Sequence, residues 1–220
     1  MTAVPKLLFA ATALTVVSVL ANQLYPETRW PSNAPRNHDP GMSRDCGPGP
    51  RVLVVGASVA LGQGASSINT EWWVLACEEL GGYWKNVAVP GHRASDEVAQ
   101  IQGNPGYEVV IVIDGANDLA FGLAPQVPGQ IEKRLPRYLA NVKEMRALRP
   151  DMVHVLQPPP FGVPSMSTLG YEEELRAIYA RMASVVDLDL SDANVDYVDL
   201  VHFGDRGQRI VADAIVERLR

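Results

Sequence analysis

The chain has 220 residues, of which 47% are hydrophobic and 20% are charged, a balance typical of one globular domain with an added segment. This composition argues against an intrinsically disordered chain. The formal net charge of -6 would repel a phosphate backbone, and no local basic patch stands out along the sequence. We therefore expect no nucleic acid partner.

The first residues have the layout of an export signal. Residues 7–21 are apolar and uncharged, and Lys6 precedes them. A run of this length fills the apolar region of a signal peptide but falls short of the roughly 20 residues that span a bilayer. Val19 and Ala21 are small, as a signal peptidase site requires, which predicts cleavage before Asn22.

Two alternatives to cleavage stay open. If the segment is retained, residues 4–21 would associate the protein with a membrane; a buried helix is the other alternative. We assign residues 1–21 to a signal peptide or N-terminal anchor, and we expect an exported protein that is secreted or periplasmic.

Residues 22–50 are rich in Pro, Asn, Arg and Gly and have no apolar periodicity, which predicts a proline-rich linker without chemistry. Cys46 ends this linker and Cys77 lies in the first expected helix of the domain. In an oxidising compartment two such cysteines can pair. The alternative is a buried Cys77 beside an exposed Cys46; their spacing fits no zinc motif.

From residue 51 onward, short apolar runs alternate with helical patterns. We expect five strands, at residues 51–56, 83–89, 108–114, 152–157 and 195–200. Helices are expected from residue 69 or 70 to Gly81, around 95–101, within 130–148 with a point of interruption at Pro136, at 171–185, and from near Asp205 to the C-terminus.

This alternation predicts right-handed crossovers and a five-stranded parallel sheet between two helix layers. The fold class is α/β, a three-layer α/β/α sandwich formed by residues 51–220. In such sheets ligands bind outside the carboxyl ends of the strands.

The residues at these strand ends suit acyl transfer. Ser58 follows the first strand, Gly91 the second and Asn117 the third, while Asp199 and His202 follow the fifth. Acyl transfer needs a nucleophile, a base, a group that orients the base, and donors for the oxyanion. Taken singly, Ser58 is more often a turn residue, and Asn117 is as often a turn former as a donor.

Four sequence blocks together resemble the SGNH hydrolases, also called GDSL lipases and acylhydrolases, over essentially all of residues 51–220. The blocks are VLVVGASVALGQGAS, PGHRASD, IDGANDLAFG and DLVHFGDRGQRIVADAI. The resemblance implies a flavodoxin-like fold and a serine esterase that needs no cofactor or metal.

The same resemblance assigns roles to residues of this chain. Ser58 would be the nucleophile, His202 the base and Asp199 its orienting carboxylate. The oxyanion hole would consist of the Ser58 amide, Gly91 and Asn117. One departure is Ala57, since the family's Gly-Asp-Ser is Gly-Ala-Ser here; the missing Asp is not a triad member, so Ala57 puts the rigidity of the loop in question rather than the chemistry.

Two other functions fit parts of the sequence. Gly56, Gly62 and Gly64 could cradle a phosphate, but Gln63 and Gly64 stand where a P-loop needs Gly and Lys. A catalytically inactive binding module on the same fold remains the alternative to an enzyme, because of Ala57.

Other residues have no assigned role. His92 could line the cleft, although a loop histidine without a catalytic task is the simpler interpretation, and His154 is expected to be a hydrogen-bonded core histidine. Five side chains could form the wall of an acyl pocket, or they could simply pack: Trp72, Trp73, Phe121, Phe161 and Met166.

The sequence leaves the substrate open among small-molecule esters and acylated carbohydrates or lipids. The insertions between the four blocks are short and leave little room for a lid. This favours short acyl groups.

Overall fold

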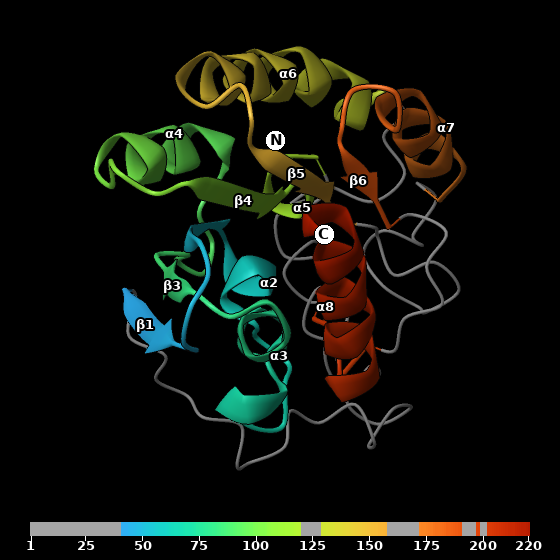
Figure 1. Cartoon of the computed structure of the whole chain (residues 1–220). Helices are drawn as coiled ribbons and strands as arrows, with labels where there is room; N and C mark the ends of the chain where they lie inside the picture. The colour runs from blue at the N-terminus through green and yellow to red at the C-terminus, as the bar shows by residue number, and fades with distance from the viewer. Residues whose placement is uncertain (1–40, 120–128, 158–171, 191–196, 199–201) are drawn as a thin grey trace, which may run out of the picture.

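The computed structural model of the chain describes residues 41–119, 129–157, 172–190, 197–198 and 202–220 (Figure 1). The expected signal peptide or anchor and most of the linker lie outside these residues and stay predictions. Within the described ranges, no helix combines the length and apolar character needed to cross a bilayer.

The described residues form one six-stranded sheet in the order β1-β3-β2-β4-β5-β6. The expected α/β fold with a parallel sheet is confirmed, because five adjacent strands run parallel in the flavodoxin-like order. The five are β2 (Arg51–Gly56), β3 (Tyr83–Asn86), β4 (Val109–Asp114), β5 (Val153–Leu156) and β6 (Leu188–Asp189).

The sixth strand is β1 (Met42–Asp45), which pairs antiparallel with the edge strand β3. It lies in the segment expected to be linker. Its sequence, MSRD, carries no run of apolar residues, so hydrophobic patterning gave no signal for it. The strand is instead held by main-chain hydrogen bonds to β3.

The fifth parallel strand of the described sheet is β6, which is two residues long and precedes the expected strand at residues 195–200. Of that expected strand only Tyr197 and Val198 are described, and neither belongs to the sheet. Tyr197 instead forms an isolated antiparallel bridge with Phe203, and the Val198 N–H donates to the His202 carbonyl at 2.9 Å. The chain therefore reverses direction between Val198 and His202, and these backbone hydrogen bonds close the turn.

Each of the five expected helices is present to within a few residues, and α6 continues through Pro136. A 3-10 turn, η2 (Ile68–Thr70), and two one-turn helices, α2 and α5, were not expected. The helices are α2 (Ser58–Leu61), α3 (Trp72–Leu80), α4 (Ala94–Gln102), α5 (Ala116–Leu119), α6 (Gln130–Leu148), α7 (Glu172–Met182) and α8 (Asp205–Leu219).

The sheet lies between two helix layers (Figure 1). Alternate residues of β2 point to opposite faces: Val52 and Val54 pack with α2, α3 and α8, whereas Leu53 and Val55 pack with α4, α6 and α7. All four side chains are fully buried. Burial on both faces explains why the strands are apolar runs without alternation.

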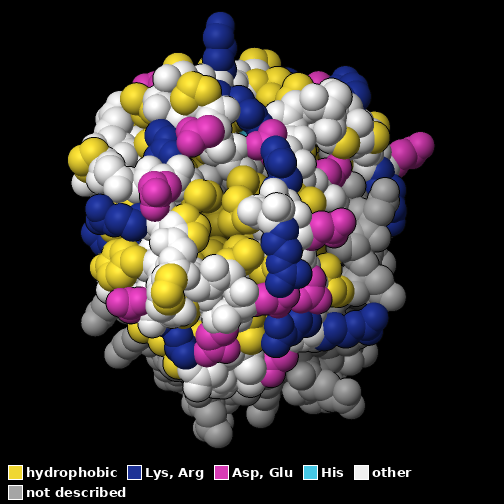
Figure 2. Space-filling model, viewed as in Figure 1, with side chains coloured by type: hydrophobic (Ala, Val, Ile, Leu, Met, Phe, Trp, Pro, Cys, Tyr) yellow, Lys and Arg dark blue, Asp and Glu magenta, His cyan; other side chains and the backbone are white. Residues whose placement is uncertain are grey.

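The face of the molecule seen in Figure 2 carries basic and acidic side chains intermingled, with hydrophobic side chains gathered near its middle. No large field of a single sign forms on this face.

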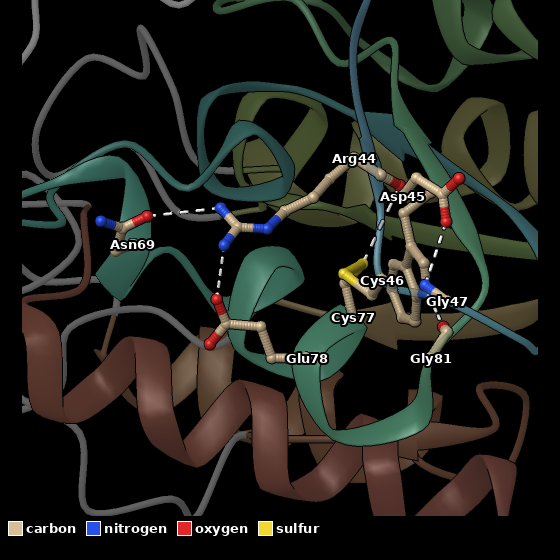
Figure 3. The surroundings of a disulfide bond; sticks show 9 residues. Arg44, Asp45, Cys46, Gly47, Asn69, Cys77, Glu78 and Gly81 are labelled. Atoms are coloured by element: carbon tan, nitrogen blue, oxygen red, sulfur yellow. Dashed lines mark hydrogen bonds and ion pairs between the residues drawn. A yellow bond between two sulfur atoms is a disulfide. The ribbon is translucent and has the colours of Figure 1, made fainter.

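Cys46 and Cys77 form a disulfide, with their Cα atoms 5.9 Å apart (Figure 3). The bond ties the segment after β1 to α3. Arg44 lies beside it and donates to Glu78 at 2.5 Å and to Asn69 at 3.3 Å. The edge strand is thus fastened covalently and by side chains to the helix that covers it.

Removing this disulfide should destabilise the fold. The bond closes a loop of 31 residues. The loop-closure entropy of the unfolded chain predicts a loss of roughly 4 kcal/mol in the free energy of unfolding for the double variant Cys46→Ala/Cys77→Ala. Urea unfolding measures it, and adding reductant should weaken the wild type but not the double variant. Equal midpoints for the two proteins without reductant would contradict the prediction.

Candidate active site

The candidate nucleophile lies at the turn between β2 and α2. Gly56 ends the strand with φ at +142°, and a Cβ atom there would lie 2.3 Å from the Ile113 carbonyl oxygen, so only glycine fits. Ser58 is half-buried and is the first residue of α2. Its backbone N–H therefore has no acceptor within the helix.

Side chains from two other elements hold this short helix. The Trp72 indole donates to the carbonyls of Val59 and Ala60, each at 3.1 Å, and the Asn86 amide donates to Ala60 at 3.0 Å. Both side chains are fully buried. They satisfy carbonyls that a one-turn helix leaves open, so the loop is fixed with alanine at position 57.

The structure brings Ser58 and His202 together across 144 residues of sequence. The Nε2 atom of His202 lies 2.9 Å from Ser58 Oγ. The turn closed by the Tyr197–Phe203 bridge presents His202 at this position.

This turn lies directly against the loop that follows Ser58. Gly64 has φ at +104°, and a Cβ atom there would lie 2.3 Å from the Phe203 carbonyl oxygen. The fully buried Gln208 connects this turn, the loop after Ser58 and the start of α3. Its side-chain amide donates to the carbonyls of Gly62 and Phe203, at 3.1 and 3.2 Å, and its side-chain oxygen accepts from the backbone N–H of Trp72 at 3.0 Å.

Asp205 adds a second connection at the start of α8. Its carboxylate accepts from the backbone and hydroxyl of Ser66, at 2.8 and 2.6 Å, and from the Thr70 hydroxyl at 2.8 Å. Burial alone would raise the pKa of Asp205, but these hydrogen bonds outweigh it and the pKa lies below its ordinary value. The carboxylate is therefore ionised at neutral pH and holds the loop to α8.

Asn117 lies beside the loop that contains Gly91. Its side-chain amide donates to the carbonyl of His92 at 2.8 Å. An amide nitrogen carries two N–H groups, so this bond uses one and fixes the plane in which the other points. Gly91 itself has φ at +83°, which bends the backbone next to this contact.

Gln100 connects this loop to the end of β2. Its side chain accepts from the Gly56 N–H at 2.9 Å, donates to the Gly56 carbonyl at 3.2 Å and lies 2.9 Å from His92 Nδ1. His92 is thus a half-buried, hydrogen-bonded loop residue. Gln100 was not singled out from the sequence, because no motif marks it.

A buried polar cluster lies under the Asn117 turn. Asp114 Oδ1 accepts from the Tyr138 hydroxyl at 2.6 Å and lies 2.7 Å from His154 Nε2. Burial, and then the neighbouring Asp114 carboxylate, raise the pKa of Glu97 well above its usual range, so Glu97 is protonated and can donate to Asp114. His154 is the hydrogen-bonded core histidine that the sequence predicted.

Several predicted residues lie outside the described part of the chain: Asp199, Phe121, Phe161 and Met166. Trp72 and Trp73 are buried in the core, which favours packing over a pocket wall. Among the described residues, no group of three or more His, Cys, Asp or Glu side chains could hold a metal ion.

Comparison with known proteins identifies the fold. Neither a family model nor a curated protein sequence matches the chain. Solved structures do match, with a TM-score of 0.54 at 18% identity for a carbohydrate acetylesterase from Sinorhizobium meliloti, covering 77% of this chain and 98% of that one. A lipolytic protein of the G-D-S-L family from Veillonella parvula matches with a TM-score of 0.51 at 13% identity, covering 76% of this chain and 96% of that one.

A further carbohydrate acetylesterase family member from Sinorhizobium meliloti has a TM-score of 0.55 at 16% identity, with 78% of this chain and 97% of that one covered. The predicted resemblance to the SGNH and GDSL proteins is therefore confirmed for the fold.

Glu71, packed under the Ser58 loop, predicts a pH effect on stability. It is 1% exposed, and burial raises its pKa from 4.5 to about 8, although a hydrogen bond from Trp73 opposes the rise. Between those values the unfolded chain releases a proton that the folded chain keeps. Its contribution to stability is therefore complete below pH 4.5 and is lost as the pH rises through about 8.

Glu71→Gln removes this titration. The difference in Tm between the variant and the wild type should grow in favour of the variant as the pH rises from 5 to 8, and it should level off by pH 9, where both the folded and the unfolded wild type have lost the proton. Thermal unfolding across this range measures it, with the exposed Glu217→Gln as control. A constant difference in Tm would show that Glu71 titrates normally.

Proposed function

We propose that this chain, which has the fold of the G-D-S-L lipolytic proteins and carbohydrate acetylesterases, is a serine esterase that cleaves carboxylic esters through an acyl-enzyme on Ser58. The observation that carries the proposal is the 2.9 Å contact between His202 Nε2 and Ser58 Oγ. A nucleophile and base in hydrogen-bond reach, at the carboxyl edge of a parallel sheet, have the arrangement that acyl transfer requires.

In the proposed reaction, His202 Nε2 accepts the hydroxyl proton while Ser58 Oγ attacks the ester carbonyl. The protonated imidazole then gives this proton to the leaving alcohol, and the acyl group stays on Ser58. Water deprotonated by His202 releases the acid. Asp199, outside the described residues, is proposed to orient the imidazole through Nδ1.

The proposed oxyanion hole combines the backbone N–H groups of Ser58 and Gly91 with the Asn117 amide. The bond from Asn117 to the His92 carbonyl supports this role, because it orients the amide before substrate arrives. Preoriented donors stabilise the developing charge without reorganising during the reaction.

For the substrate class, we propose acylated carbohydrates that carry short acyl groups. Two of the similar structures are named as carbohydrate acetylesterases. The short insertions expected between the four sequence blocks also favour a small acyl group.

Ser58 and His202 should act as a unit. Ser58→Ala and His202→Ala should each lower kcat on 4-nitrophenyl acetate by roughly 10⁴–10⁶, and the double variant should lose little more. A fluorophosphonate should add one label, located at Ser58 by peptide mass spectrometry, to the wild type. Ser184→Ala, a change of a surface serine, serves as control.

Label on a different serine, or full activity of Ser58→Ala, would contradict this mechanism. If folded wild type showed neither hydrolysis of any ester nor labelling, the inactive binding module would be the better description.

The oxyanion role of Asn117 predicts an effect on turnover. Asn117→Ala should lower kcat by roughly 10²–10³ with a smaller change in KM, because the bond strengthens as charge develops. Steady-state kinetics measures both constants, and Asn69→Ala, which removes an exposed amide elsewhere, controls for general damage. An unchanged kcat would return Asn117 to the role of a turn former.

A further inference from the structure

A cavity of about 280 Å³ opens next to the candidate active site, between α5, the start of α4 and the first half of α6. Among the described residues that line it, four side chains are basic and one is acidic, which gives this part of the lining a formal charge of +3 in a chain whose net charge is -6. The described lining residues are Arg93, Asp118, Lys133, Arg134, Arg137 and Tyr138.

Two hydrogen bonds connect this cavity to the proposed oxyanion hole. The Asn117 amide donates to the His92 carbonyl at 2.8 Å, and the next residue, Asp118, accepts from the Ala94 N–H at 3.0 Å. Arg93 lies between those two contacts in sequence. Asp118 lines the cavity and directly follows Asn117, so their Cα atoms are about 3.8 Å apart. A substrate bound at Asn117 would therefore lie beside the cavity.

The basic side chains on α6 destabilise the helix that carries them. Lys133 and Arg137 are four residues apart and share one helix face, where like charges repel each other. Lys133 is also the fourth residue of the helix, close to the N-terminus, whose partial positive charge disfavours cations. An anion in the cavity would relieve both effects.

Three described acids near these cations in the sequence, Asp96, Asp118 and Glu132, each have a hydrogen-bond or ion-pair partner. Burial is the main influence on Asp118 and raises its pKa, while Arg93 and Arg137 partly oppose the rise. Its Oδ2 is already engaged by the Ala94 N–H. Asp96 accepts from the backbone N–H of Arg93 at 3.0 Å, and Glu132 pairs with Arg181 at 2.7 Å.

We propose that this cavity is a subsite for an anionic group, a carboxylate, sulfate or phosphate, carried by the ester substrate. The proposal rests on the proposed esterase function and narrows its substrate class to acidic esters. Arginine forks suit such groups because they present parallel N–H donors to two oxygens. The cavity volume is just under the range of about 300–1,000 Å³ for ligand sites and suits one anionic substituent with the ring or short chain that bears it.

Two matched ester pairs test the proposal and locate the anion. O-acetyl glucuronic acid and its neutral methyl ester differ in charge on the alcohol side; 4-nitrophenyl hemisuccinate and 4-nitrophenyl butyrate differ in charge on the acyl side. The measured quantity is the ratio of kcat/KM for the anionic member to that of the neutral member. We expect this ratio to exceed one in one of the pairs and to fall in 1 M salt, where the Debye length is about 3 Å.

Variants should shift that ratio in opposite directions. Arg93→Gln and Arg137→Gln should each lower it about tenfold, the value of one charge-assisted hydrogen bond. Asp118→Asn should raise it, because the amide oxygen can still accept from Ala94 while the negative charge is gone. Arg209→Gln, an equal change of charge on α8, should leave it unaltered. A merely structural role would lower both rates and leave the ratio constant.

Binding of glucuronate to Ser58→Ala, measured by calorimetry, separates this proposal from the esterase. Hydrolysis of neutral esters without charge preference or glucuronate binding would overturn the subsite and leave the function standing. Glucuronate binding that Arg93→Gln and Arg137→Gln weaken, without hydrolysis of any ester by the wild type, would overturn the function and support the anion site. If the protein neither hydrolysed any ester nor bound glucuronate, the proposed function and the anion subsite would both be overturned.

Discussion

The turn that carries His202 lies against the loop after Ser58 so closely that a Cβ atom at residue 64 would sit 2.3 Å from the Phe203 carbonyl oxygen. This close approach places His202 Nε2 2.9 Å from Ser58 Oγ, although the two residues lie near opposite ends of the domain sequence. Because both loops are irregular, their carbonyls need partners from elsewhere, and the buried Gln208 supplies them from α8. The position of the candidate base therefore depends on a glycine and a glutamine that take no part in the chemistry.

The charges around the proposed oxyanion hole are arranged in two layers. Behind the Asn117 turn, Asp114 is surrounded by donors, and the raised pKa of Glu97 keeps that second carboxyl protonated. The buried layer thus carries less negative charge than its composition suggests. In front, Arg93 and Arg137 line the cavity. Both features keep the surroundings of the hole from repelling a developing negative charge.

The sequence predicted those parts of the molecule that depend on local pattern and on topology. Apolar runs predicted four of the five parallel strands, and residues at their carboxyl ends meet at one edge, so Ser58 and Asn117 could be placed at that edge from the sequence. His202 was placed there through an expected strand at residues 195–200, whereas its contact with Ser58 depends on the turn bridged by Tyr197 and Phe203. Side-chain contacts over long separations had no such signal. Gln208 bonds to backbone groups of Gly62 and Trp72, 136 or more residues away, and Arg93 and Arg137 line one cavity only because α4 packs on α6.

Ala57 shows how the local sequence and long-range side-chain contacts combine at the candidate nucleophile. In the family that the sequence resembles, an aspartate occupies this position beside the nucleophile, and its loss raised the question of rigidity. Bonds from Trp72 and Asn86 to the α2 carbonyls hold the loop without it. The substitution also removes a carboxylate next to Ser58 that would repel an acidic substrate. The net charge of -6 opposes such a substrate little at the site, since at physiological salt distant charges are screened beyond about 8 Å, and the described residues that line the cavity are mainly basic.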